Sequence, residues 1–294
     1  MTWTAWRLSR STAIATAIFA AVSVVYLLWT GSQLRSSFAS TGLQACLAGG
    51  HIRQDCSEVA YNFYQLTRTL TGGQPVVGVL SLVPGLIGAF IGGPLVAREI
   101  ETGTLRLAWT QAVTRGRWLT TRSLVALLVV IVGVAIITAA LTYWRWPLDQ
   151  VDGRVEVNGY DVQGVIPFAY AILAFSLGVT FSVLTRRVVP SIAATLGVFF
   201  LVRTVLETVV RPRLLSPVTL SFTGKPPENL DVLLKGSWLL EERVPRPGSR
   251  FPTVYTFQPA AHFWPLQLRE AGILLALSVV AATFAFYWIR GRMH

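Results

Sequence analysis

The sequence has few charged residues. Only 13% of its 294 positions are Asp, Glu, Lys or Arg, and 53% are hydrophobic. Soluble domains carry roughly 25% charged residues, so this chain has too few charges to cover a surface that faces water. The composition therefore excludes an ordinary soluble enzyme and favours a protein embedded in a membrane.

The sequence also lacks the motifs of a chain that performs chemistry itself. Its only Gly-Lys pair, Gly224 and Lys225, is followed by Pro226, so no phosphate-binding G-x-x-x-x-G-K-[ST] loop is present. The three histidines do not have the spacing of metal ligands, and neither a G-x-S-x-G nor an H-E-x-x-H motif occurs. We therefore predict no catalytic residue, no metal site and no cofactor bound by this chain.

The basic residues are not gathered into one patch. The net charge is +11, but Arg and Lys flank apolar runs along the whole sequence. A nucleic-acid-binding protein concentrates its positive charge on one face, whereas a membrane protein places it beside anionic lipid head groups. We expect a lipid bilayer as partner, and no nucleic acid.

Long runs almost free of charge recur along the chain. About 20 apolar residues are needed for a helix to cross a hydrocarbon core roughly 30 Å thick. Six runs have about that length: 13–29, 76–97, 123–143, 165–184, 189–210 and 271–289. We therefore predict an all-α membrane protein whose residues 1–294 form one domain of six transmembrane helices.

The distribution of arginines predicts the orientation. An even number of spans places both termini on one side. With the termini inside, short inner pieces hold eleven of the basic residues; these pieces are 1–10, 98–122, 185–188 and 290–294. The opposite loops are about three times longer in total and hold thirteen. Positive charge is denser in cytoplasmic loops, so we expect both termini in the cytoplasm.

The two cysteines agree with this orientation. Cys46 and Cys56 both fall in the first outer loop. An oxidising compartment would let them close a short disulfide bond, which is the pairing we predict, with two free thiols as the alternative.

The segment between the second and third spans predicts a short helix outside the bilayer. Gly103 permits a break of the backbone, and Thr104 can cap a new helix. One face of that helix is apolar at i, i+3, i+4 and i+7: Leu105, Ala108, Trp109 and Ala112. From the pattern alone, this helix could equally rest on lipid head groups or bind a protein.

This segment resembles the coupling segment of type 2 ATP-binding cassette (ABC) permeases. The resemblance lies in acidic residues, Gly-Thr, an apolar helix, and then Thr114, Arg115 and Trp118 leading into the third span. Three longer stretches resemble a branch common in actinobacteria: 2–10, 92–118 and 257–273. Together with the six spans, the resemblance covers nearly the whole chain.

The resemblance implies a permease subunit of a bacterial plasma-membrane exporter, which is not itself an enzyme. Such a subunit pairs with a second permease chain, as a homodimer or heterodimer, and with two separate ABC ATPase subunits that bind ATP and Mg²⁺. It implies a hydrophobic or amphipathic substrate such as a drug or lipid. A coupling helix that contacts the ATPase is carried over by position onto Glu99, Glu101, Thr102, Gly103, Thr104, Leu105 and Trp109, with Arg115 and Arg117 at its edge.

Residues 2–10 predict an amino-terminal interfacial helix. Trp3, Trp6, Arg7 and Arg10 have helical spacing, and Trp and Arg anchor helices at the membrane interface. Two interpretations remain: an anchor only, or an anchor that also touches the ATPase, as in the resembling family.

Span two carries Gly88 and Gly92 as a small-xxx-small pair, which lets helix backbones approach closely. The pair could pack within one subunit or line a moving seam between subunits.

Arg203 and Glu207 are the only full charges well inside a predicted span. They are four residues apart and share one helical face. An unpaired charge at mid-bilayer costs roughly 2.5–3.5 kcal/mol, so we expect them to pair with each other or to reach water. We predict a place in the translocation path or outer gate. The alternatives are a pair that reaches the interface, or a span that ends early and continues as a re-entrant helix.

The outer segment 211–269, between spans five and six, is rich in proline and cannot be one long helix. Its aromatic residues favour an ordered extracytoplasmic loop segment, with disorder as the alternative.

Two other classes of protein compete with the exporter. A secondary transporter driven by an ion gradient would place several ionisable groups near mid-membrane, whereas this sequence has only Arg203 and Glu207 well inside a predicted span. A membrane protein without a transport function would not explain the Gly-Thr coupling pattern.

Overall fold

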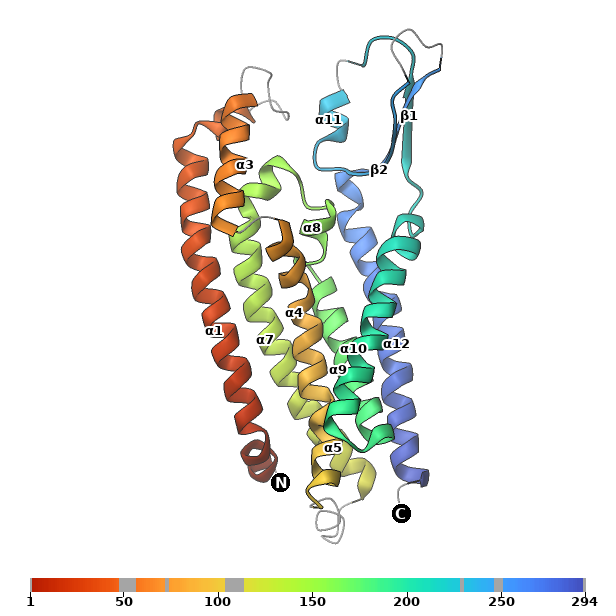
Figure 1. Cartoon of the computed structure of the whole chain (residues 1–294). Coiled ribbons are helices and arrows are strands. Elements are labelled where there is room, and N and C mark those ends of the chain that lie inside the picture. The colour runs from red at the N-terminus through yellow and green to blue at the C-terminus, as the bar shows by residue number, and fades with distance from the viewer. Residues whose placement is uncertain are drawn as a thin grey trace.

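The computed structural model describes residues 2–47, 57–71, 74–103, 114–227, 230–245 and 251–292. Long helices run side by side, and a small β-sheet stands beyond one end of the bundle (Figure 1). Helix α1 begins and α12 ends at the opposite end, which we call the terminal end; the other is the sheet end (Figure 1).

The long helices are α1 (Thr2–Ser40), α4 (Gln74–Gly92), α7 (Arg115–Val151), α9 (Ile166–Thr185), α10 (Val188–Val205) and α12 (Phe263–Arg292). Short helices are α2 (Leu43–Cys46), α3 (Ser57–Thr71), α5 (Pro94–Glu101), α8 (Val157–Tyr160) and α11 (Leu230–Leu234). A π-helix (Leu206–Val210) and a 3₁₀ turn (Arg211–Arg213) follow α10, and a second 3₁₀ turn (Ala260–His262) precedes α12.

Five helical stretches in the described residues are long and apolar enough to cross a membrane: Gly78–Glu101, Gly116–Val151, Ile166–Thr185, Val188–Arg213 and Ala260–Gly291. Each overlaps one of the predicted spans two to six. The first predicted span lies within α1, but most side chains of residues 2–20 are outside the described set. The six-helix topology as a whole therefore stays a prediction.

Several helices are longer than the uncharged runs predicted. Helix α7 has 37 residues, which corresponds to about 55 Å, longer than a hydrocarbon core. Its extra turns carry Arg145 and Asp149, whose side chains pair at 2.9 Å. Because such charges neutralise one another, the helix continues past the point where the apolar run ends.

The predicted interfacial helix at 2–10 is not a separate element. These residues form the first turns of α1, which is continuous to Ser40. No Gly or Pro occurs from Thr2 to Thr30, so nothing in the local sequence breaks the helix.

Helix α9 is the centre of the bundle. Fourteen of its 20 residues are buried, and α4, α5, α7, α10 and α12 pack around it. The small residues of α4 make the closest approach: a Cβ atom at Gly88 would lie 2.3 Å from the Ala171 carbonyl oxygen, and one at Gly92 would lie 2.4 Å from that of Phe175. The pair therefore packs within one subunit.

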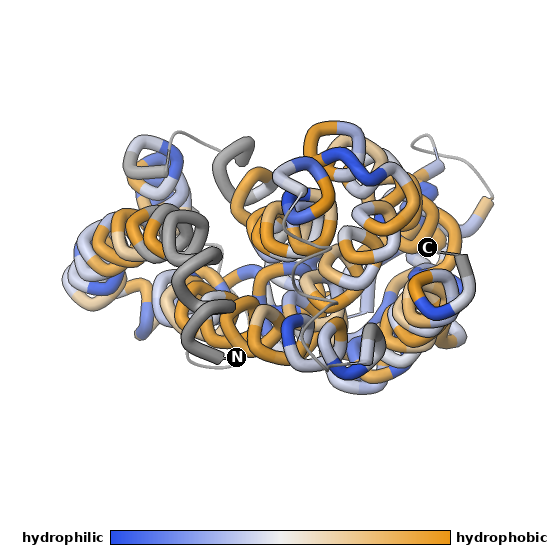
Figure 2. Tube along the Cα trace, turned by 90° about the horizontal axis from the view of Figure 1, so that it is seen from below, coloured by the Kyte–Doolittle hydropathy of each residue, from blue (hydrophilic) through white to orange (hydrophobic). Residues whose placement is uncertain are grey.

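The periphery of the bundle is apolar. Large hydrophobic side chains are exposed on α1, α7, α10 and α12, among them Val25, Leu128, Leu201 and Val280. Viewed along the bundle, hydrophobic residues extend to its rim (Figure 2). Exposed apolar surface of this extent indicates helices that face lipid.

The described residues are mostly helical, which is consistent with the predicted all-α membrane protein, but they also include a small sheet that the prediction did not contain. Strands β1 (Val218–Phe222), β2 (Trp238–Arg243) and β3 (Thr253–Gln258) form an antiparallel sheet in the order β1-β3-β2. Leu220 pairs with Tyr255, and the rings of Phe222 and Tyr255 stack 6.1 Å apart. Strand β3 consists of β-branched and aromatic residues from Thr253 to Phe257, which are the residue types that favour a strand.

Candidate functional site

The segment that leads out of α4 is anchored to the central helix. Pro94 starts a new helix, α5, because proline lacks an amide hydrogen and cannot continue α4. The Ser182 hydroxyl of α9 accepts hydrogen bonds from the amides of Val96 and Ala97 at 3.0 and 2.6 Å. The backbone amides that lose their helical partners at this break thus donate to a side chain of α9. These hydrogen bonds fix α5 to α9.

Helix α5 ends at a glycine turn. Gly103 has φ 72°, the left-handed conformation that ends many helices, and its amide donates to the Ile100 carbonyl at 3.1 Å. The Thr102 hydroxyl donates to the Arg98 carbonyl at 2.9 Å. Thr104, Leu105 and Trp109 lie outside the described residues, so the coupling helix stays a prediction.

Glu99 points into the bundle. It is 6% exposed and forms an ion pair with Arg122 of α7. The Arg122 guanidinium carbon also lies 5.4 Å from the centre of the Trp118 ring. The ion pair therefore joins α5 and α7, the two helices that flank residues 104–113. The sequence predicted an ATPase contact for Glu99, but it did not predict Arg122 as its partner.

Glu101 contacts a third helix. Its carboxylate accepts a hydrogen bond from the Val188 amide at 3.0 Å, at the start of α10. A negative charge at a helix amino terminus is stabilising because it faces the positive end of the helix dipole. The two glutamates thus connect α5 to α7 and to α10.

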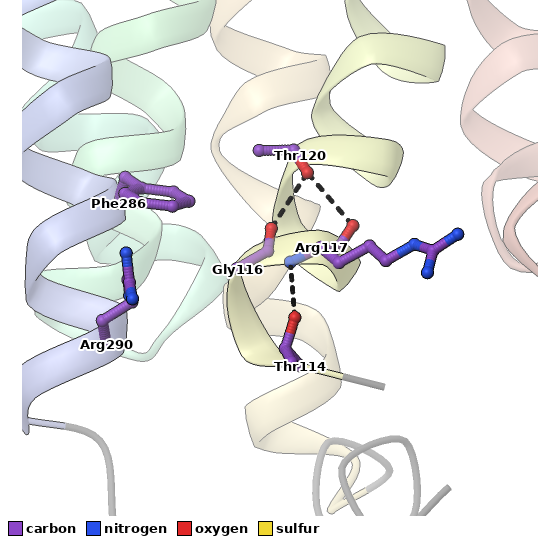
Figure 3. Close-up of a pocket in the computed structure, with 6 residues that line it drawn as sticks. All are labelled: Thr114, Gly116, Arg117, Thr120, Phe286 and Arg290. Atoms are coloured by element: carbon purple, nitrogen blue, oxygen red, sulfur yellow. Dashed lines mark hydrogen bonds between the residues drawn. The ribbon is translucent and has the colours of Figure 1, made fainter. Parts of the chain in front are cut away.

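The chain resumes at Thr114, the residue that caps α7. Its hydroxyl accepts from the Arg117 amide at 3.4 Å (Figure 3). Arg117 is exposed. Arg115 lies in the first turn of α7, and its side chain is outside the described set. The structure therefore places the predicted edge residues at the beginning of α7.

A second candidate site lies toward the sheet end. We call Asp161, Arg203, Arg211 and Glu270 the charge cluster; each is at most 7% exposed. Asp161 accepts from Arg203 and from Arg211, both at 2.6 Å. Arg211 also binds Glu270 through two hydrogen bonds of 2.8 and 2.9 Å. Two negative and two positive charges thus neutralise one another.

Neutral side chains complete the charge cluster. The hydroxyls of Tyr160 and Tyr170 donate to Glu270 at 3.1 and 2.8 Å. On its other side, Arg203 donates to the hydroxyl of Ser81 in α4 at 3.0 Å. The network therefore joins α4, the loop before α9, α10 with its 3₁₀ extension, and α12.

The predicted pairing of Arg203 with Glu207 is secondary. Their closest atoms are 3.8 Å apart, and the Glu207 side chain is 32% exposed, whereas Asp161 binds Arg203 at 2.6 Å. A π-helix at Leu206–Val210 separates Arg203 from Arg211. Such turns are frequent at functional sites, and this one shifts the helical face that follows it.

Sequence reasoning missed three of the four charges in the charge cluster. Asp161, Arg211 and Glu270 stand one to four residues outside the predicted spans, so the pattern of apolar runs does not include them. A signal was present: each charge lies within about one helical turn of the end of an apolar run, where a helix can continue if partners are near.

A smaller polar contact lies nearer the sheet end. The hydroxyl of Tyr64 in α3 donates to the Asp152 carboxylate at 2.5 Å. Burial raises the pKa of Asp152 above its usual value, and the hydrogen bond from Tyr64 opposes that shift.

Cys46 is disulfide-bonded. Cys56 lies outside the described residues, so the bond between the two stays a prediction.

Comparison with known proteins identifies a family. The family model described as "ABC-2 membrane transporter related" matches residues 17–211, about two thirds of the chain. The match includes the flanks of residues 104–113 and ends at Arg211, before the sheet and α12. No curated protein and no solved structure matches the chain.

Proposed function

The chain belongs to the ABC-2 membrane transporter related family, and from this premise we propose that it is the permease subunit of an ATP-driven exporter in a bacterial plasma membrane. Two permease chains form the translocation path, and two separate ATPase subunits bind ATP and Mg²⁺. Both termini lie in the cytoplasm, on the side of the ATPases. The substrate is a hydrophobic or amphipathic compound.

One observation carries the coupling part of the proposal: the Glu99–Arg122 ion pair beside residues 104–113. It joins the helix before this segment to the helix after it. Ser182 and Glu101 add connections to α9 and α10. A movement imposed on residues 104–113 is therefore passed to four helices together, as a rigid body.

The predicted coupling residues divide into two groups by position. Thr104, Leu105 and Trp109 make the direct ATPase contact, with Arg115 and Arg117 at its edge. Glu99, Glu101, Thr102 and Gly103 hold the segment in place through their contacts with Arg122, the Val188 amide, the Arg98 carbonyl and the Ile100 carbonyl, respectively. This division refines the expectation that all seven residues touch the ATPase.

We further propose that the charge cluster forms the outer gate of the path. Its ion pairs join α10 and α12 through Asp161 and Arg211, and hydrogen bonds with Ser81 and Tyr170 connect them to α4 and α9. Arg203 belongs to this gate, and Glu207 lies beside it as a half-buried neighbour. Opening the path between two permease chains requires these helices to move together or the ion pairs to exchange partners.

Co-purification tests the proposal. The tagged chain is expressed with candidate ATPase subunits encoded near it, and the bound ATPase and its hydrolysis rate are measured. We expect a stoichiometric ATPase that is lost in the Leu105→Asp/Trp109→Asp variant. The matched control, Leu239→Asp/Val244→Asp, adds two negative charges at exposed apolar positions of the sheet end and should keep the ATPase.

The buried carboxylates of Asp161 and Glu270 are the observation that favours the alternative, a secondary transporter driven by an ion gradient. Asp161 and Glu270 lie near or within membrane-spanning helices, where a gradient-driven transporter places ion-coupling groups. Both are already neutralised by arginines, which favours a structural lock. If a well-folded chain binds no candidate ATPase, the exporter proposal fails, and proton- or sodium-dependent transport by Asp161→Asn and Glu270→Gln variants becomes the next measurement.

A further inference from the structure

Helix α4 has a proline inside it. Pro84 has no amide hydrogen, so the carbonyl of Leu80, one turn earlier, has no helical donor, and the proline ring crowds that turn. Sharp bends in helices occur at such positions. Pro84 therefore divides α4 into two parts. We call residues 74–83, toward the sheet end, the upper part, and residues 85–92 the lower part (Figure 1).

The lower part of α4 is fixed by close contacts with two helices. A Cβ atom at Gly85 would lie 2.2 Å from the Phe199 ring of α10, and Gly88 and Gly92 touch the backbone of α9. The Phe199 ring in turn packs edge-on against the ring of Tyr170 in α9, with 5.8 Å between the ring centres. Because these contacts leave no gap, the lower part of α4 can move only together with α9 and α10.

The upper part of α4 is packed less closely. Among its residues 78–83, Val83 is buried, but Val79 is 60% exposed. No atom lies within 4 Å of a Cβ atom built at Gly78. The polar connection of the upper part to α10 passes through Ser81, which is 8% exposed. The position of the upper part therefore depends strongly on the contacts of this one serine.

Arg203 of α10 holds the turn that precedes Pro84. Its guanidinium donates to the Ser81 hydroxyl at 3.0 Å and to the Ser81 carbonyl at 3.4 Å. The Ser81 hydroxyl donates in turn to the Gly78 carbonyl at 2.7 Å. Neighbouring helices commonly bind the backbone where a proline interrupts a membrane helix. The forked guanidinium can make these contacts while it also binds Asp161 at 2.6 Å.

We propose that α4 is hinged at Pro84 and that the contact between Ser81 and Arg203 is the latch of this hinge. When the latch opens, the upper part swings about Pro84 while the lower part stays against α9. Glu207, whose carboxylate lies 3.8 Å from Arg203, can then accept the guanidinium that Ser81 has left. The hinge rests on the outer gate proposed above for its role in transport, but the movement itself requires neither an ATPase nor a substrate.

The expected movement is large enough to measure. Val79 lies five residues before Pro84, which is about 7.5 Å along the helix. A change of about 20° in the bend would displace Val79 by about 3 Å. Phe90 lies six residues after Pro84 and is 48% exposed, so it offers a second labelling position that the hinge should leave in place.

Spin-label distance measurements on the purified chain in lipid nanodiscs test the hinge. Val79→Cys or Phe90→Cys is combined with Val280→Cys on α12, where the side chain is 68% exposed. We call the two distances the upper and the lower distance. A chain without introduced cysteines measures any labelling of the native ones. Ser81→Ala removes the hydroxyl and keeps every ionised side chain. We expect it to shift or broaden the upper distance by about 3 Å and to leave the lower distance unchanged.

Matched substitutions serve as controls. Ser278→Ala removes a buried hydroxyl of α12 that donates to the Leu274 carbonyl of its own helix at 2.7 Å, and it should not change the upper distance. Pro84→Ala restores the missing amide donor and should suppress the effect of Ser81→Ala. Pro147→Ala, which removes the proline inside α7, should not suppress it.

Four outcomes would overturn the proposal. An unchanged upper distance in Ser81→Ala would mean that the serine is no latch, and an equal effect of Ser278→Ala would mean that the effect is not local. An equal shift of the lower distance would mean that α4 moves as one rod. A shift that persists after Pro84→Ala would place the pivot elsewhere. Because no ATPase is present, the hinge can fail while the exporter proposal stands, and loss of ATPase binding leaves these distances interpretable.

Discussion

Toward the sheet end, four charged side chains are buried and bind one another, whereas at the terminal end Arg117, Arg187 and Arg290 remain exposed. The difference is physical. A buried pair is stabilised by its own geometry and loses stability when one partner is removed, while an exposed cation contributes little to the fold. Charge therefore holds the helices together toward the sheet end and is left for partners at the terminal end.

The largest effect is expected from Asp161→Ala. Asp161 binds Arg203 and Arg211, so its loss leaves two buried guanidinium groups short of a carboxylate. Removing one partner of a buried pair costs about 3–5 kcal/mol, and we expect a loss of this size in the free energy of unfolding, measured in detergent micelles with a denaturing surfactant.

The matched control for Asp161 is Glu241→Ala. Glu241 pairs with Arg243, and these side chains are 53% and 73% exposed, so the expected loss is below about 1 kcal/mol. Equal effects of the two substitutions would contradict the distinction between buried and exposed charge.

The terminal end also contains a largely buried ion pair, Glu99–Arg122, and the Arg122→Gln substitution breaks it. Glu99 is left buried without its cation, and we expect a loss of about 2–3 kcal/mol. The exchange Glu99→Arg/Arg122→Glu should recover part of it. A double-mutant cycle over these substitutions measures the coupling, and a coupling near zero would mean that the pair does not brace α5 against α7.

A contact without charge comes next. In Gly92→Ala the new Cβ atom would lie 2.4 Å from the Phe175 carbonyl oxygen, which forces α4 away from α9. Overpacking of this kind costs about 1–3 kcal/mol. Gly197→Ala in α10 is the control, since no atom lies within 4 Å of a Cβ atom there. Thermal unfolding of both variants should show a loss only for the first.

The smallest effect is expected from Glu207→Gln. Glu207 is half-buried and 3.8 Å from Arg203, so its charge should contribute less than about 1 kcal/mol. Comparison with Asp161→Ala by the same unfolding assay tells which carboxylate Arg203 depends on. A larger loss for Glu207→Gln would restore the pairing that the sequence predicts.

The spans were predictable because a membrane imposes a length and an absence of charge on each helix. All five stretches of the described chain that could cross a membrane overlap predicted runs. Their ends were not predictable, because Glu270 depends on Arg211, which lies 59 residues away in sequence, and Arg145 binds Glu156 as well as the nearby Asp149.

The sheet and the charge cluster depend on contacts between segments far apart. Strand β1 pairs with β3 across more than 30 residues, and proline-rich sequence between them gave no periodic signal. The charge cluster joins Asp161 to Arg203 and Arg211 across 42 and 50 residues. The spacing along one helix predicts Glu207 as the partner of Arg203. In the folded chain, Asp161 binds Arg203 at a shorter distance.

The charge cluster also has a consequence for biosynthesis. Its members leave the ribosome in the order Asp161, Arg203, Arg211, Glu270. Arg211 therefore enters the membrane region before its second carboxylate has been made, and that carboxylate arrives only with the last long helix, α12. A chain that ends before α12 lacks Glu270 and cannot neutralise the charge cluster. Its unpaired buried charge destabilises it, and unstable chains are substrates of quality-control proteases.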